Sequence, residues 1–246
     1  MHVLRSFFYR YGWDTRCRNL CPARLLRTAL PASSRSTHPA LLDVGSGELG
    51  LSAFLRGLSV VGSDLQPSIG RNGRCSFVRS AATALPFRDR SFPAVSCIDV
   101  LEHLAPAHRA EAITECVRVA SRVVLFAFPD GMRARACDQA FQEACRRHSR
   151  QVPAWVEEHL RHEYPVSDGV AEQVRQAAAQ LDRRAQLTAS ACEPLAICRL
   201  VRAAASRSTL LYALCNLWFG LGAFLMRAPR PGEGYRTVLV AELSPS

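Results

Sequence analysis

Short apolar runs alternate along this chain with segments whose apolar residues recur at helical spacing. Runs of strand length lie at residues 41–44, 59–63, 75–79, 94–98, 122–128 and 235–243, with a weaker candidate at 186–191. Helical spacing characterises residues 106–120, and residues 132–181 are helical and polar. Continuous apolar runs are typical of parallel strands that are buried on both faces. The alternation therefore predicts an α/β fold, in which helices cover both faces of a mostly parallel sheet.

The stretch at 41–55, LLDVGSGELGLSAFL, predicts a strand, a glycine turn and a helix. Gly45, Gly47 and Gly50 form a GxGxxG pattern, whose glycines permit unusual backbone angles, close approach of a ligand and tight helix packing. Asp64 ends the next strand, roughly 20 residues later, where a carboxylate can accept two hydrogen bonds from ribose hydroxyls. The combination predicts a nucleotide-binding site. The alternative is a structural turn in which Asp64 only caps the next segment.

A second informative stretch, AATALPFRDRSFPAVSCIDVLEHL, occupies residues 81–104. Its apolar run at 94–98 predicts a central strand, and Asp99, Glu102 and His103 follow directly. Ligands bind at the carboxyl ends of strands in open α/β sheets. These polar side chains are therefore candidates for a functional site.

Composition narrows the classes of function. The chain has 246 residues, enough for one large α/β domain with a sizeable core. Its formal charge of +10 would normally indicate nucleic acid as a partner, but it contains no lysine and its arginines are scattered. We therefore expect no nucleic-acid partner.

The ten cysteines form no CxxC pair and no regular framework, and several lie in apolar runs. This usage predicts reduced thiols rather than disulfides or a zinc site. The first 16 residues lack both the long apolar core and the cleavage site of a secretory signal. We therefore expect a cytoplasmic protein.

The flanking segments divide the chain further. Residues 1–39 predict a helical cap followed by a Pro- and Ser-rich linker, and residues 40–246 form the main domain with a helical insertion at 132–181. The segment at 209–226 is strongly apolar. We interpret it as a buried or lid-forming helix; the alternatives are a helix on a membrane surface, which would give peripheral membrane contact, and a short membrane span.

His159 and His162 lie three residues apart beside Glu158 and Glu163. These residues could supply two metal ligands from one helical face, but a metal site needs further converging ligands, and the sequence does not indicate them. We interpret the group as a solvated helix face and predict no metal site.

Taken together, these motifs resemble the class I S-adenosylmethionine-dependent methyltransferases, in particular the group with a small-molecule "type 11" domain. The resemblance rests on LLDVGSGELG, Asp64, ALPFRDRSF, IDVLEHL and YRTVLVAEL. It implies a Rossmann-like, doubly wound sheet of seven strands, of which the last is antiparallel, and S-adenosylmethionine as the cofactor. The acceptor would be a small molecule or a lipid-like compound, and the oligomeric state is open.

The resemblance also assigns residues to the cofactor. The loop from Gly45 to Gly47 would hold its methionine part, Asp64 its ribose and Ala81 its adenine. The full set that the resemblance implies is Asp43, Gly45, Ser46, Gly47, Asp64, Leu65, Ala81, Ala82, Ile98 and Asp99. Two positions depart from the family pattern, because Ala81 and Pro93 stand where Asp is usual. Because Ala81 lacks the carboxylate of that Asp, one hydrogen bond to adenine would be missing, and such a bond is worth about 1 kcal/mol.

Methyl transfer from a sulfonium requires mainly that the acceptor and the methyl group are close and aligned. A base would help a hydroxyl or amine acceptor, and the candidates are His103 and then Glu102. Two other functions remain open: a non-catalytic relative that binds or scaffolds, and an NAD-dependent oxidoreductase, since GxGxxG followed by an acid also fits NAD.

Overall fold

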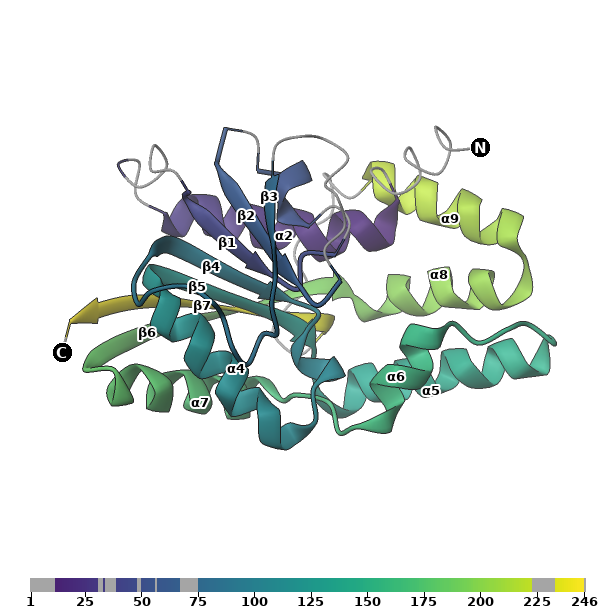
Figure 1. The fold of residues 1–246 in the computed structure, drawn as a ribbon. Coiled ribbons are helices and arrows are strands. Elements are labelled where there is room, and N and C mark those ends of the chain that lie inside the picture. Colours follow the sequence, from purple (N-terminus) through teal and green to yellow (C-terminus); the bar gives the residue numbers. More distant parts are fainter. Residues whose placement is uncertain are drawn as a thin grey trace.

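A computed structural model describes residues 12–30, 33, 39–47, 50–55, 57–66, 75–222 and 233–245. In these residues seven strands form one sheet in the order β3-β2-β1-β4-β5-β7-β6 (Figure 1). The strands are β1 (Leu41–Val44), β2 (Val60–Asp64), β3 (Cys75–Arg79), β4 (Phe92–Ile98), β5 (Ala120–Pro129), β6 (Arg183–Pro194) and β7 (Gly234–Pro245). Only β7 runs antiparallel to its neighbours β5 and β6. The predicted seven-stranded sheet with an antiparallel last strand is confirmed.

Helices cover both faces of this sheet, as Figure 1 shows. The described α-helices are α2 (Trp13–Ala29), α4 (Pro106–Val119), α5 (Gly131–Arg147), α6 (Ala154–Arg161), α7 (Ser167–Gln180), α8 (Leu195–Arg207) and α9 (Thr209–Gly222). Helices α4 and α7 pack on one face and α2 packs on the other. The helical cap that the sequence predicts is thus α2, while residues 1–11 and most of the linker lie outside the described residues.

Alternation along β5 explains how one strand serves both cores. Val124, Phe126 and Phe128 belong to the core under α4 and α7, whereas Val123 and Leu125 belong to the core under α2. Successive side chains of a strand point to opposite faces, so a continuous apolar run is required when both faces are covered.

The remaining helices α5, α6, α8 and α9 form a group at the end of the sheet where the parallel strands finish (Figure 1). This group includes the predicted helical insertion at 132–181 only in part, because α7 belongs to the sheet. It also includes α8, which the sequence analysis did not predict.

Helix α9 exposes its apolar side chains instead of burying them. Leu210 is 69% exposed, Leu214 57% and Trp218 77%, whereas Asn216 is buried. The interpretation of this segment as a buried helix is therefore wrong for 209–222, and residues 223–226 lie outside the described part of the chain. Among the described residues, no helix has both the length and the apolarity that a membrane span requires.

The expectation that every cysteine is a reduced thiol is wrong for one pair. Cys21 of α2 and Cys192 of β6 form a disulfide across 171 residues of sequence. The pairing depends on α2 crossing the sheet, so cysteine spacing alone could not reveal it. Cys97, Cys116 and Cys145 are buried thiols, as expected from their apolar surroundings.

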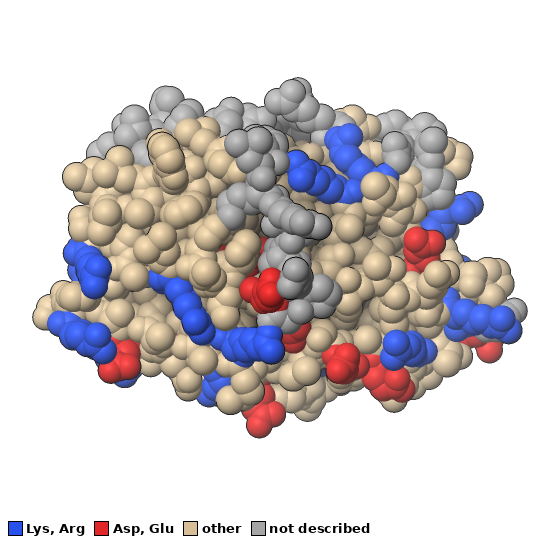
Figure 2. Space-filling model, turned by 180° about the vertical axis from the view of Figure 1, so that it is seen from behind, with Lys and Arg blue, Asp and Glu red and all other residues tan. Residues whose placement is uncertain are grey.

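Basic side chains do not gather into one field on the face seen in Figure 2, where arginines are dispersed among acidic residues. This distribution agrees with the scattered arginines of the sequence.

Candidate active site

Two cavities lie at the carboxyl ends of β1 and β4, the neighbouring strands between which the strand order reverses. Crossover connections leave such a point in opposite directions, which opens a crevice at the strand ends. The smaller cavity is lined by the glycine loop, Asp43 and Ile98. The larger, of about 530 Å³, is lined by Asp99, His103 and helices from the group beyond the sheet. Arg18 lines both cavities.

The glycine loop after β1 needs glycine for different reasons at different positions. All three glycines have positive φ. A Cβ on Gly45 would lie 2.2 Å from Cγ2 of Val100, and one on Gly50 would lie 2.3 Å from Oδ2 of Asp43. A Cβ on Gly47 would meet no described atom within 4 Å. Gly45 and Gly50 therefore permit packing of the protein itself, while Gly47 borders open space.

The helix that the sequence predicts after this loop is absent from the described residues. Leu51–Ala53 forms only a 3₁₀ turn. Gly57 has φ of +83° a few residues later, so the apolar residues between the two glycines have no room for a full α-helix. The prediction of a helix directly after the glycine loop is therefore wrong for the described residues.

Asp43 and Asp64 hold the loop from the ends of adjacent strands. Asp43 is buried and accepts hydrogen bonds from Leu51 N (2.8 Å) and Ser96 Oγ (2.7 Å), and burial raises its pKa. Asp64 accepts a hydrogen bond from the Gly47 N–H at 3.0 Å. Asp43 thus has a structural role, while Asp64 lies at the open side of the loop.

The other residues assigned to the cofactor surround these two. Ser46 Oγ is buried and has no hydrogen-bond partner among the described residues, so it is available to a ligand. Leu65 is 64% exposed directly after β2. Ala81 forms an isolated bridge with Ala84 just beyond β3, and Ala82 packs beside it against the core.

In the larger cavity, Asp99 belongs to a buried ion network rather than standing free. It binds Arg236 through both guanidinium atoms Nε and Nη2, each at 2.8 Å, and Arg18 Nε at 2.9 Å. Arg236 also donates to Glu193. Burial raises the pKa of Asp99, but the guanidinium groups of Arg236 and Arg18 outweigh that effect and hold the pKa below its usual value.

The two candidate bases differ in their access to this cavity. His103 lines it, with a side chain that is 30% exposed, and burial together with His159 lowers its pKa. Glu102 is fully buried and is not among the lining residues, and burial together with Asp99 raises its pKa well above the usual value. The geometry therefore favours His103 over Glu102 for direct contact with a ligand.

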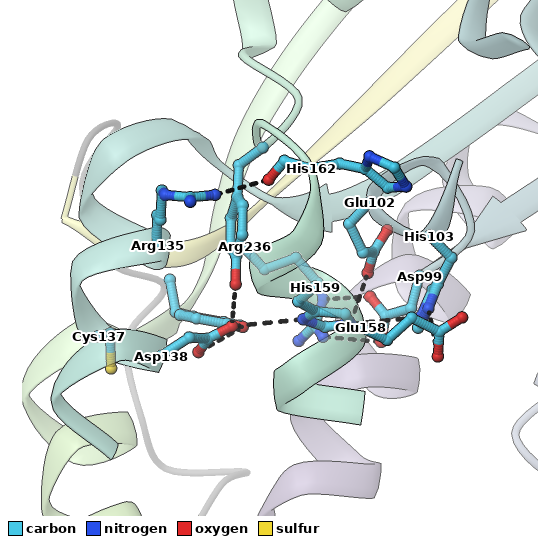
Figure 3. Close-up of polar contacts among 12 residues, drawn as sticks. Asp99, Glu102, His103, Arg135, Cys137, Asp138, Glu158, His159, His162 and Arg236 are labelled. Carbon is cyan, nitrogen blue, oxygen red and sulfur yellow. Dashed lines mark hydrogen bonds and ion pairs between the residues drawn. The ribbon is translucent and has the colours of Figure 1, made fainter. Parts of the chain in front are cut away.

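His159 lies within the site, contrary to its interpretation as part of a solvated helix face. It is 6% exposed and its Nε2 lies 3.2 Å from Nε2 of His103. Its Nδ1 is 3.3 Å from Asp138 (Figure 3). Asp138 also accepts hydrogen bonds from Tyr164 and Tyr235. His162 does not join this cluster. Sequence spacing could not separate the two histidines, because the contacts of α6 (Ala154–Arg161) decide which one is buried.

Other lining residues come from segments in which the sequence analysis predicted no site residue. Arg18, Trp155, Arg202 and Tyr235 belong to four different elements. The Arg202 guanidinium carbon lies 4.2 Å from the ring centre of Tyr235, and Arg202 also pairs with Asp138. The cavity therefore has aromatic walls, and three of its arginines, Arg18, Arg202 and Arg236, are already paired with carboxylates.

Loss of the central cation should destabilise the fold strongly. In Arg236→Met, Glu193 and Asp99 would remain buried with too little positive charge, and the free energy of unfolding should fall by about 3–5 kcal/mol. Arg18→Met is the matched control, because Arg18 binds the same carboxylate from a side chain that is 41% exposed and should cost at most about 1 kcal/mol. Urea unfolding measures both, and equal losses would contradict the prediction.

The same network predicts a pH dependence. Because the folded-state pKa of Asp99 is depressed, its ion pairs stabilise the fold above its unfolded pKa of about 3.9 and lose that effect as pH falls through the lower folded value. The difference in unfolding free energy between wild type and Arg236→Met should therefore be largest near neutral pH and shrink as pH falls below about pH 4, where Asp99 becomes protonated in both proteins. A difference that stays unchanged to pH 2 would contradict this account.

Comparison with known proteins agrees with this fold and motif set. Residues 42–128 match the family model described as a methyltransferase domain. No curated protein matches the chain. Among solved structures, a protein of Thermotoga maritima described as a S-adenosylmethionine-dependent methyltransferase is similar, with a TM-score of 0.55 and 13% identity over 98% of this chain and 95% of that one.

A second similar structure comes from Anabaena variabilis and is described as a methyltransferase from an antibiotic biosynthesis pathway. It has a TM-score of 0.54 and 15% identity, over 91% of this chain and 98% of that one. At such identity the likeness concerns the fold alone, while the family model covers the glycine loop, Asp64 and the end of β4. Residues 42–128 are therefore similar to a methyltransferase domain, and the sheet has the class I Rossmann-like fold that the motifs predicted.

Proposed function

We propose that this protein binds S-adenosylmethionine along the ends of β1 and β2, with only its methionine end at the smaller cavity of about 50 Å³. Its methyl group would pass, by in-line displacement, to an acceptor in the larger cavity. One observation carries the proposal: the consecutive residues Ile98 and Asp99 at the end of β4 line the smaller and the larger cavity, respectively, and Arg18 lines both. A displacement requires the donor and acceptor to be held in contact and aligned. Adjacent cavities at one strand end supply that arrangement.

Features of the smaller cavity fit the cofactor. The unpartnered Ser46 Oγ and the open space beside Gly47 can receive polar groups of the methionine part. The Asp64 carboxylate, at the end of β2, can accept hydrogen bonds from ribose hydroxyls. When bound, the cofactor supplies an activated sulfonium methyl group. The chain's own residues have to bind the cofactor and the acceptor, orient them toward each other and exclude water.

Within the larger cavity, His103 is the side chain best placed to take a proton from an acceptor hydroxyl or amine. It lines the cavity close to the end of β4, and Glu158 lies 3.3 Å from its Nδ1 and orients the ring. Glu102 lacks access to the cavity, so a direct role as base is assigned to His103 alone.

We further infer that the acceptor is lipid-like, with a polar head in the cavity. Thr209 and Tyr212 at the start of α9 line the cavity, while Leu214 and Trp218 on the same helix are exposed. A surface helix of a soluble domain usually turns its apolar side inward. An apolar exterior next to the acceptor cavity fits peripheral contact with a membrane that presents the acceptor.

Cofactor binding is tested by isothermal titration with S-adenosylmethionine and, in parallel, NAD. Wild type should bind the former in the micromolar range, and Asp64→Ala should weaken binding by about 10–100-fold through lost charge-assisted hydrogen bonds. Gly47→Ala should weaken binding as well while costing only about 1–2 kcal/mol of stability, because its Cβ meets open space.

Gly50→Ala serves as the contrasting variant, because its Cβ would collide with Asp43 and should reduce stability itself. Binding of NAD alone would support the oxidoreductase alternative. Binding of neither cofactor by a folded sample would support the non-catalytic scaffold and overturn the proposed function.

Membrane contact is tested by flotation with liposomes, with and without anionic lipid. Wild type should float with the vesicles, and the double variant Leu214→Ser, Trp218→Ser should reduce the bound fraction at least about tenfold, because each buried apolar side chain is worth about 1.5–3 kcal/mol. Met132→Ser is the matched control, since Met132 on α5 is 77% exposed, as is Trp218. No association with either lipid composition would argue against a membrane-presented acceptor.

A further inference from the structure

Three side chains converge beside the larger cavity, and the atoms that they turn toward one another lack suitable hydrogen-bond donors among the described residues. Glu102 and His103 come from the turn after β4, and His159 comes from α6. Nε2 of His159 lies 3.2 Å from Nε2 of His103 and 3.9 Å from Oε1 of Glu102. All three ligand atoms lie within 4.8 Å of one another.

The two imidazoles cannot both be satisfied as neutral rings. Nδ1 of His103 faces Glu158 and Nδ1 of His159 faces Asp138, each at 3.3 Å (Figure 3). A carboxylate accepts a hydrogen bond, so each Nδ1 carries the ring proton. Both Nε2 atoms then present lone pairs to each other at 3.2 Å. A positive charge between them removes this repulsion.

Glu102 provides the second, independent observation. Its side chain is fully buried, and neither carboxylate oxygen accepts a hydrogen bond from another described residue. The nearby Arg109 does not serve it, because that guanidinium donates to the backbone oxygens of Leu101, Leu104 and Glu163. A buried carboxylate without a partner is strongly disfavoured, and a bound cation is one of the few ways to retain it.

We propose that Glu102, His103 and His159 bind a divalent transition-metal ion. Two nitrogens bound to one tetrahedral ion are about 3.3 Å apart, close to the separation of the two Nε2 atoms. Imidazole and carboxylate ligands suit Zn²⁺, Fe²⁺, Co²⁺ or Mn²⁺ better than Mg²⁺ or Ca²⁺. Asp138 and Glu158, on the outer nitrogens, act as the carboxylates that orient metal-bound histidines.

The site faces the acceptor cavity, because both histidines line it. Three protein ligands leave positions open, and these would be taken by water or by an oxygen of the acceptor. This last point rests on the proposed function, whereas metal binding does not. With an ion bound, Nε2 of His103 is a ligand and cannot accept the acceptor's proton, so the two roles of His103 exclude each other.

The test uses the full chain without a polyhistidine tag, treated with a chelator and then titrated with Zn²⁺ and Co²⁺ by calorimetry. One ion should bind per chain, and bound Co²⁺ should give visible absorption bands. Glu102→Gln and His159→Gln should each weaken binding at least tenfold, and Glu158→Gln about tenfold through loss of ligand orientation. Mg²⁺ should bind at least 100-fold more weakly than Zn²⁺.

His162→Gln is the control, because His162 lies three residues from His159 in the sequence but outside the cluster in the structure. The affinity of the His162→Gln variant for the metal ion should equal that of wild type. Failure of wild type to bind either ion would overturn the proposal. So would equal binding by wild type and Glu102→Gln, provided that both show the same melting temperature in chelator. Titration of the same samples with S-adenosylmethionine separates the hypotheses, since loss of cofactor binding alone refutes the proposed function and leaves the metal site standing.

Discussion

A single buried guanidinium, that of Arg236, joins three strands at the edge of the sheet where both cavities lie. It extends from β7 to Asp99 at the end of β4 and to Glu193 on β6. Two carboxylates so close together would repel each other in a buried setting, and the shared cation makes their burial tolerable. The antiparallel last strand therefore does more than complete the sheet, since it also fixes the geometry at the strand end on which the site is built.

The two halves of the site differ in how they are made. The smaller cavity is mostly local, because Asp43 and the glycine loop follow one another in sequence, and only Arg18, Asn19 and Ile98 come from α2 and β4. The larger cavity is assembled from α2 and the helices beyond the sheet, which are far apart in sequence. A cavity built from peripheral helices can differ between proteins without any change to the glycine loop beside it.

Helix α9 shows how polar contacts can determine which side of a helix faces inward. Its buried side carries Asn216, and the carbonyl of Gly220 accepts a hydrogen bond from Arg16 at 3.0 Å. Trp13 packs edge-on against Phe219. These contacts hold α9 against α2 and leave several leucines outside, opposite to the usual arrangement for a helix on a soluble domain.

The sequence by itself determined the sheet, the glycine loop and the placement of Asp64 and His103, because these depend on short apolar periods and on motifs within single βα units. It missed the short 3₁₀ turn after Gly50, where backbone geometry overrides helical spacing. Only the tertiary structure decided that His159, and not His162, meets Glu102, and that Cys21 meets Cys192. Those pairs arise when distant helices pack on the sheet, and no local pattern records such contacts.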